Sequence, residues 1–292
     1  MNETSEGKRR PLVDRRIRFL LALGVLVGGG CSEAPRTETL HTDAPTAAPS
    51  EGRDYARIQR ERAERMEAVA AEFRQSQGDA LFTTAEQVVA RYLDVVGGRE
   101  AFDTITTMVI RLSGHGPMGR LAEIERYYKR PLHYRQQTKG TASATVSDGR
   151  RLWRVTPDGW EEMEGPGHFR LASIDGYFID YEAWGVSYTL LGVTALDGDP
   201  GYSVERRWPD GSMETLFFSA TSGLLTAVQS EYMIHPASWF SYWDYRDIGG
   251  VRIPHVQIRS VGELGPPHGA VVESVEINVS LPDSLFLPPG ER

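Results

Sequence analysis

Cysteine is almost absent from this sequence, with Cys31 the single one among 292 residues. One cysteine excludes an intrachain disulfide and any metal site built from several thiolates. The seven histidines are scattered, and no pair lies two or four residues apart, where two imidazoles would share one face of a strand or helix. The sequence therefore offers no metal-binding motif.

The usual signatures of nucleotide and hydrolase chemistry are also missing. No G-x-x-x-x-G-K-[ST], H-E-x-x-H or G-x-S-x-G motif occurs. Residues 114–119 match G-x-G-x-x-G, but a strand-like run follows them instead of a helix, and Lys139 and Gly140 stand where the acidic residue belongs. We interpret these glycines as a hairpin loop. We expect no cofactor and no enzymatic activity, although a carboxylate pair assembled from distant strands stays open.

Positive charge is scarce, and the formal net charge is -8. The first thirty residues hold six basic and three acidic side chains, which leaves 26 basic against 37 acidic residues and a net charge of -11. An acidic body of this kind repels phosphate backbones. The balance argues against nucleic acid as a partner.

No apolar run near the N-terminus is long enough to span a membrane. Residues 19–27 (FLLALGVLV) form a run of nine, which as a helix rises about 14 Å against roughly 30 Å of hydrocarbon. The run follows a basic stretch and precedes three glycines and Cys31. This arrangement is typical of a signal peptide, which we place at residues 1–30.

The residues around Cys31 resemble a bacterial lipoprotein signal, in which small residues precede a cysteine that becomes the lipidated N-terminus. The resemblance implies lipidation of Cys31. Ser32 is not the aspartate that retains such proteins at the inner membrane, so the resemblance also implies an outer-membrane lipoprotein facing the periplasm. A soluble exported protein is the alternative.

Three segments follow the signal peptide. Residues 31–52 are rich in Pro, Thr, Ala and Glu and lack apolar periodicity, which predicts a flexible tether. Residues 53–79 predict a charged helix with a thin apolar stripe and several i,i+4 ion pairs. This helix lies on the domain or, alternatively, binds a partner. Residues 80–292 predict the folded domain.

The folded domain opens with a second helix, which ends at a pair of glycines. Thr83 and Glu86 match a capping box, and an apolar face extends from Val88 to Val96. Gly97 and Gly98 then either cradle a phosphate or end the helix. No strand precedes the helix to aim a phosphate at it, so we expect Gly97 to close the helix and a second short helix to follow.

From Met108 onward the sequence predicts antiparallel strands. Short runs of β-forming residues alternate with turn pairs such as Asp148-Gly149 and Gly249-Gly250. The fold class is therefore α+β and mainly antiparallel β, with a large sheet that must curl. We expect strands at residues 108–113, 123–129, 133–138, 151–156, 187–193, 202–207, 214–219, 224–233, 239–246, 256–261 and 271–281.

One segment and one set of side chains suggest a hydrophobic binding site. Residues 167–184 predict a short helical excursion that forms a lid, with apolar residues at helical spacing: Leu171, Ile174, Phe178 and Tyr181. A curled sheet can also hold a lipid on its concave face. The candidate cavity residues are Trp153, Trp239, Trp243, Tyr245, Val275 and Ile277. Ordinary core packing is the alternative for each of them.

Three stretches resemble the LolA-like family of outer-membrane lipoprotein-sorting proteins. Residues 85–114 (AEQVVARYLDVVGGREAFDTITTMVIRLSG) resemble its opening helix, Gly-Gly break, short helix and first strand. Residues 197–232 (DGDPGYSVERRWPDGSMETLFFSATSGLLTAVQSEY) resemble its central hairpins. Residues 245–260 (YRDIGGVRIPHVQIRS) and 271–289 (VVESVEINVSLPDSLFLPP) resemble its closing strands.

The resemblance implies a strongly curved open half-barrel sheet, with helices covering the concave face and acyl chains of lipoproteins or other lipids held inside. It implies a lipid-anchored periplasmic protein that serves lipoprotein or lipid trafficking at the outer membrane, and it leaves room for another envelope protein as a partner. An envelope-stress sensor or interaction protein on the same fold is the alternative, and an enzyme on this scaffold is a third reading. The family's functional arginine is not selected by any motif among Arg111, Arg126 and Arg135.

Overall fold

The computed structural model describes residues 55–115, 121–163, 172–230, 238–261 and 268–290. These residues belong to one compact unit, residues 53–292. The expected signal peptide, Cys31 and the tether of residues 31–52 lie outside the described residues.

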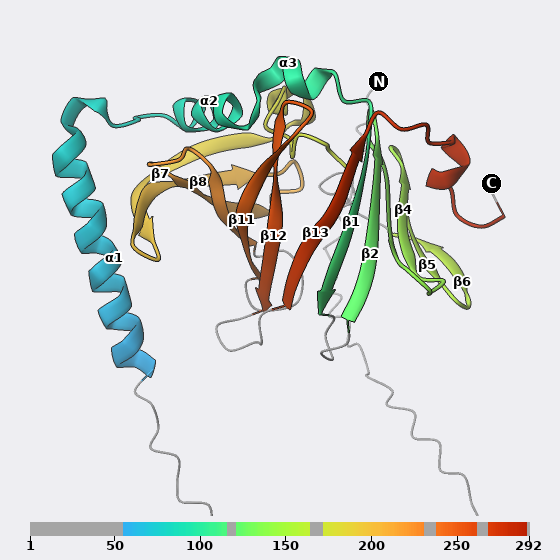
Figure 1. Ribbon diagram of the computed structural model, residues 1–292. Coiled ribbons are helices and arrows are strands. Elements are labelled where there is room, and N and C mark those ends of the chain that lie inside the picture. The colour runs from blue at the N-terminus through green and yellow to red at the C-terminus, as the bar shows by residue number, and fades with distance from the viewer. Residues whose placement is uncertain (1–54, 116–120, 164–171, 231–237, 262–267, 291–292) are drawn as a thin grey trace, which may run out of the picture. The chain divides into compact units, whose positions relative to one another are not determined.

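The described chain holds three α-helices, several 3-10 turns and a long series of strands (Figure 1). The helical elements are α1 (Tyr55–Gln77), η1 (Gly78–Ala80), α2 (Ala85–Val96), α3 (Gly98–Asp103), η3 (Tyr181–Trp184) and η4 (Asp283–Phe286). The strands are β1 (Thr107–His115), β2 (Leu121–Lys129), β3 (His133–Thr138), β4 (Ala144–Asp148), β5 (Leu152–Thr156), β6 (Gly159–Glu162), β7 (Ser187–Leu196), β8 (Asp199–Arg207), β9 (Met213–Ser219), β10 (Leu225–Ser230), β11 (Ser238–Ile248), β12 (Val251–Val261) and β13 (His268–Ile277).

All of these strands join one antiparallel sheet of 13 strands, in the order β6-β5-β4-β3-β2-β1-β13-β12-β11-β10-β9-β8-β7. Two local meanders meet in the middle, where the first strand pairs with the last: Met108 lies opposite Ile277 and Ile110 opposite Val275. The sheet is strongly curved and not closed, so β6 and β7 are its two edges (Figure 1). The expected fold class, an open, curved antiparallel sheet with helices, is confirmed.

The connection between α2 and α3 ends the first helix and does not form a phosphate-binding loop. Gly97 adopts a φ of 121° and its N–H donates to the Leu93 carbonyl. A Cβ at Gly97 would lie 2.1 Å from the Gly250 carbonyl oxygen in the β11–β12 turn, so only glycine fits there. The capping box begins one residue later than expected, because Thr84 caps the Gln87 N–H and Gln87 reaches back.

The two faces of the sheet are distinct, and we call the face packed against α2 and α3 the inner face. Strand β2 illustrates the alternation: Ile124 and Tyr128 join the main hydrophobic cluster on the inner face, while Glu123 and Glu125 lie on the outer face. The main cluster unites α2, α3, residues 172–186 and strands from β1 to β13. A second cluster (Ala144, Val146, Trp153 and Val155, with Leu287 against it) lies on the outer face of β4 and β5.

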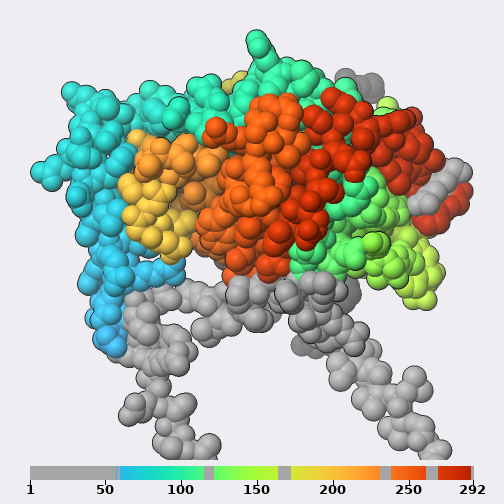
Figure 2. Space-filling view, in the orientation of Figure 1, coloured from blue at the N-terminus to red at the C-terminus, as the bar shows by residue number. Residues whose placement is uncertain are grey.

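Helix α1 packs against the edge strand β7 and its neighbour β8 (Figure 2). The ring of Phe73 meets that of Tyr202 at 6.1 Å, and Arg62 forms an ion pair with Asp197 at 3.2 Å. Ala70 is buried, while most described side chains of the helix remain exposed. The helix therefore lies on the domain as expected, and its binding of a partner stays a prediction.

Candidate functional site

The expected lid is a bent loop in its described part. We call residues 172–186 the lid segment; it runs through turns and bends and becomes helical only in η3. The φ angles of Gly176, Tyr177 and Asp180 are 66°, 65° and 51°. An α-helix does not allow positive φ angles. The helical spacing of Ile174, Phe178 and Tyr181 therefore predicted the wrong local conformation. It correctly indicated that these side chains pack against the core.

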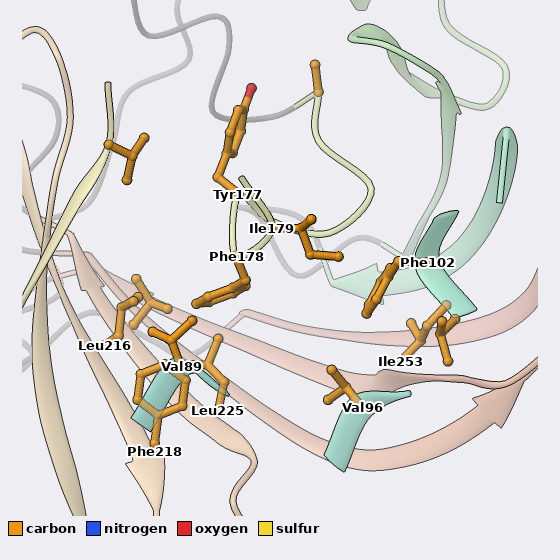
Figure 3. Packing of buried hydrophobic residues seen from close by; sticks show 14 of the residues in the cluster. Val89, Val96, Phe102, Tyr177, Phe178, Ile179, Leu216, Phe218, Leu225 and Ile253 are labelled. Carbon is orange, nitrogen blue, oxygen red and sulfur yellow. The ribbon is translucent and has the colours of Figure 1, made fainter. Parts of the chain in front are cut away.

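Phe178 packs on the inner face over β7–β9 (Figure 3). Its ring lies 4.7 Å from that of Tyr92 on α2, 5.9 Å from that of Tyr188 on β7 and 6.1 Å from that of Phe218 on β9. Ile174 and Tyr181 pack against the same cluster, and Leu171 lies outside the described residues. An aromatic side chain from a loop thus occupies the place where the concave face of the sheet would meet a ligand.

Polar contacts hold the lid segment at several points along its backbone. Arg206 Nη1 donates to the Gly176 carbonyl at 2.8 Å, and the Tyr188 hydroxyl donates to the Tyr177 carbonyl at 3.1 Å. Both hydrogen bonds are accepted by main-chain oxygens. They therefore fix the backbone conformation of the loop and do not depend on which side chains it carries.

A further anchor lies at the surface, where Arg99 on α3 forms a two-pronged ion pair with Asp180 at 2.7 and 2.6 Å. Hydrogen bonding to Arg99 holds the pKa of Asp180 below its ordinary value of 3.8. Because both side chains are more than half exposed, water and salt weaken this anchor relative to the buried ones.

Arg206 is anchored in turn by a buried carboxylate. Its Nε and Nη2 donate to Glu214 Oε2 at 2.9 and 2.6 Å, and the two side chains are only 11% and 12% exposed. The Trp208 indole N–H donates to the same oxygen at 3.0 Å. Burial lowers the pKa of Arg206, but the attraction of Glu214 outweighs it and the net pKa is raised. Arg206 is therefore a fully paired buried cation.

Two pockets border the lid and the helices. One of about 490 Å³ lies between α2 and the lid segment and is lined by Val89, Leu93, Phe178, Tyr181 and their neighbours. The other, of about 270 Å³, lies between α1, α2 and β9 and includes Phe73, Phe82 and Tyr202. The pocket beside the lid segment is mixed in character, because Glu86, Arg99, Asp180 and Glu182 line it together with its apolar residues.

The structure separates the six expected cavity residues. Tyr245, Val275 and Ile277 pack against the main cluster. Trp153 is fully buried, but in the second cluster on the opposite face of the sheet. Trp239 stacks on Phe217 with ring centroids 5.0 Å apart, away from both clusters, and Trp243 is 45% exposed.

Strand β11 explains this division. Val228 of the main cluster pairs with Phe240, which places Phe240 and Tyr242 on the inner face and Trp239 and Trp243 on the outer face. Tyr245 still reaches the main cluster, and its hydroxyl donates to the Leu225 carbonyl at 2.7 Å. Asp244, with a φ of 53°, interrupts the regular strand just before it. Phe240 and Tyr242 are the inner-face aromatics that the sequence interpretation missed.

The three arginines that no motif separated lie in three different surroundings. Arg111 lies on the outer face, where it pairs with Glu276 and Ser274. Arg135, also on the outer face, donates to Gln137 at 2.8 Å and to the Leu285 carbonyl at 3.3 Å. Arg126 alone of the three lies on the inner face, between Ile124 and Tyr128. Strand alternation carries this signal, because Arg126 shares its face with two apolar residues.

Two further observations concern metal binding and membrane spanning in the described part of the chain. Nowhere in it do three or more His, Cys, Asp or Glu side chains gather in a way that could hold a metal ion. Among its helices none is long and apolar enough to cross a membrane.

Comparison with known proteins finds relatives by fold. No protein-family model matches the chain, and no curated protein sequence matches it. The LolA superfamily protein NE2245 from Nitrosomonas europaea superposes with a TM-score of 0.51 at 14% identity, over 70% of this chain and 98% of that one. A DUF1329 family protein from Desulfovibrio piger gives a TM-score of 0.49 at 12% identity, over 69% of this chain and 96% of that one.

A domain assigned to outer membrane lipoprotein sorting from Vibrio parahaemolyticus also gives a TM-score of 0.49, at 9% identity, over 69% of this chain and 95% of that one. The superposition on the Nitrosomonas europaea protein shows a shared fold and, at 14% identity, no more than the fold. The chain therefore has the LolA-like fold that its sequence resembles.

Proposed function

We propose that this protein binds acyl chains of a lipoprotein or another lipid on the inner face of its sheet, and that the lid segment leaves that face when the ligand enters. The protein carries its ligand without chemistry. The observation that carries the proposal is Phe178, a loop side chain inserted among the rings of Tyr92, Tyr188 and Phe218. An acyl chain would replace it there.

The free energies favour a long chain over a short one. Exposing Phe178 costs about 3 kcal/mol, and breaking the two buried hydrogen bonds to the lid backbone costs about 2 kcal/mol more. Each methylene group removed from water returns about 0.8 kcal/mol. Tyr177 and Ile179 of the lid segment are also buried, so displacing the whole segment costs more than this sum. Affinity should therefore rise with the length of the acyl chain.

The lid exchange is best tested by locking the lid segment in place. In a Cys31→Ser background, Arg99→Cys and Asp180→Cys introduce thiols on the two sides of the exposed ion pair, which a short bismaleimide can bridge. We expect the bridged protein to lose uptake of a fluorescent fatty acid, since the ligand site stays filled. The unbridged double variant and the two single-cysteine variants serve as controls. Equal uptake by the bridged and unbridged proteins would refute lid exchange.

The protein is further proposed to be an outer-membrane lipoprotein that works in the periplasm. The support is the lipoprotein-like signal around Cys31 together with the LolA-like fold, since the Vibrio parahaemolyticus domain carries an outer membrane lipoprotein-sorting assignment. We expect Cys31→Ala to move the protein from the membrane fraction to the soluble fraction of the envelope. Unchanged sedimentation of that variant would rule out lipidation as the anchor.

A further inference from the structure

Arg126 is a cation on the inner face whose hydrogen-bond partners are all neutral. From the middle of β2 its Nε donates to Gln136 Oε1 at 2.9 Å on β3. Its Nη1 donates to Gln257 Oε1 at 3.2 Å on β12, so the side chain crosses in front of β1 and β13. Among the described residues, no carboxylate forms an ion pair with it.

The tyrosines around Arg126 do not supply the missing negative charge. Burial raises the pKa of Tyr128, Tyr134 and Tyr242, the last to about 12, so all three are neutral hydroxyls at physiological pH. Burying a charge without a counter-charge is costly, whereas Arg206 on the same face has Glu214. Within the described part of the chain, the region around Arg126 therefore lacks one negative charge.

A second cation lies next to Arg126. Arg259 is two residues beyond Gln257 on β12 and shares its face, opposite Phe240. Its guanidinium lies 5.6 Å from the Phe240 ring centroid and donates to the Ser238 hydroxyl over a long distance of 3.5 Å. An anion placed at Gln257 would meet an arginine on each side.

Apolar side chains surround this pair of arginines. Ile124 and Tyr128 flank Arg126 on β2, and Ile110 and Val275 continue its row across β1 and β13. Ile124, Phe240 and Val275 are only partly buried, so they retain apolar surface that a ligand can cover. A cationic spot within an apolar face matches an amphiphile with a negatively charged head group.

We propose that Arg126, with Arg259 beside it, binds the oxyanion head group of an anionic amphiphile, a carboxylate or a phosphate, while the chain of that amphiphile lies on the inner face. This inference rests on the acyl-chain binding proposed above and names the chemical class of the ligand. It distinguishes a fatty acid or an acidic lipid from a neutral acyl chain.

The test compares three ligands with the same chain and different head groups. Dodecanoate, dodecyl phosphate and dodecanol are titrated calorimetrically into the full chain and into its Arg126→Gln, Arg126→Lys and Arg111→Gln variants. We expect the wild type to bind at least one of the anions about tenfold or more tighter than dodecanol, as a charge-assisted hydrogen bond to a partly buried group provides. The tighter of the two anions identifies the head group.

The Arg126→Gln variant should lose this preference and still bind dodecanol, while Arg126→Lys should retain much of the preference. Arg111→Gln, on the outer face, should behave like the wild type. If Arg126→Gln does not fold, the salt dependence of the wild type decides, since the preference for the anion should shrink as salt rises.

Equal wild-type affinities for dodecanol and the anions, or an unchanged preference in Arg126→Gln, would overturn the head-group inference and leave acyl-chain binding standing. Absence of binding by all three ligands would overturn the proposed function and this inference with it.

Discussion

The two halves of the inner face differ in how their arginines are compensated. In the half formed by β7–β10, Arg206 pairs with Glu214, and the lid segment covers both with Phe178. In the half formed by β1–β3 and β11–β13, Arg126 has two glutamine carbonyls as partners and no carboxylate among the described residues. Among the described residues, the arginine of one half has a carboxylate partner and the arginine of the other half has only neutral ones. The same type of side chain is therefore compensated within the fold in one place and, as we propose, by a bound anion in the other.

The largest expected effect comes from making the same substitution in both halves. Arg206→Gln should lower the free energy of unfolding by about 3 to 5 kcal/mol, because the buried Glu214 carboxylate loses the guanidinium of its ion pair. Arg126→Gln should change it by less than about 1 kcal/mol, because two lost hydrogen bonds are offset by the removal of an uncompensated charge. Urea unfolding of both variants measures the difference. Similar losses of unfolding free energy at the two positions would mean that the two arginines are compensated to the same degree.

Removing the ring that fills the first half should favour ligand binding. Phe178→Ala weakens the closed arrangement by about 2 kcal/mol, since part of the ring's burial is lost while the loop backbone keeps its polar anchors. Apparent affinity for a fluorescent fatty acid should then rise by about tenfold or more, because a larger fraction of molecules has the lid displaced. A fall in affinity would show that Phe178 contacts the ligand instead of excluding it.

A single hydrogen bond to the lid should have a smaller effect of the same sign. Tyr188→Phe removes the donor to the Tyr177 carbonyl and should raise fatty-acid affinity about threefold to tenfold. Tyr245→Phe is the matched control, since that hydroxyl donates to the Leu225 carbonyl in the same cluster without touching the lid segment. Equal changes in the two variants would remove the special role of the lid contact.

The smallest expected effect comes from acid. The pKa of Asp180 is lowered in the folded protein, so its pair with Arg99 contributes fully above the ordinary carboxyl pKa and is lost as pH falls below about 4 through the lowered value. Dodecanol affinity, which does not depend on ligand ionisation, should therefore rise slightly in this range. Asp180→Asn should remove that change. An identical pH profile in the variant would assign the effect to another group.

The sequence predicted the sheet well because strand alternation and turn pairs are local signals. Eleven of the strands were expected, and the two that were missed, β4 and β6, are five and four residues long, with Ser, Asp, Gly and Glu among them. The end of the last strand was placed too late. Asn278 has a φ of 56° and ends the regular strand near Ile277, a conformation that the alternating pattern does not reveal.

The candidate site was less predictable because its geometry depends on contacts between distant segments. Strand alternation places Trp239 and Trp243 on the face opposite Phe240 and Tyr242, but it does not say which face is covered. That question is decided only by the pairing of Phe240 with Val228 and by the packing of the helices against the inner face. The lid conformation likewise depends on Arg206 and Tyr188, which meet its backbone from other strands.

The pairing of β1 with β13 in the middle of the sheet has a consequence for the order of folding. Each wing of the sheet is a meander of neighbours in sequence, whereas the seam between Ile110 and Val275 joins the two ends of the strand region. Contacts between distant parts of a chain form slowly because a long loop must close first. The close approach of Gly97 to the β11–β12 turn also joins parts of the chain that are far apart in sequence. We therefore expect the wings to form first and the seam last, so the inner face is complete only after both ends of the folded domain have been synthesised.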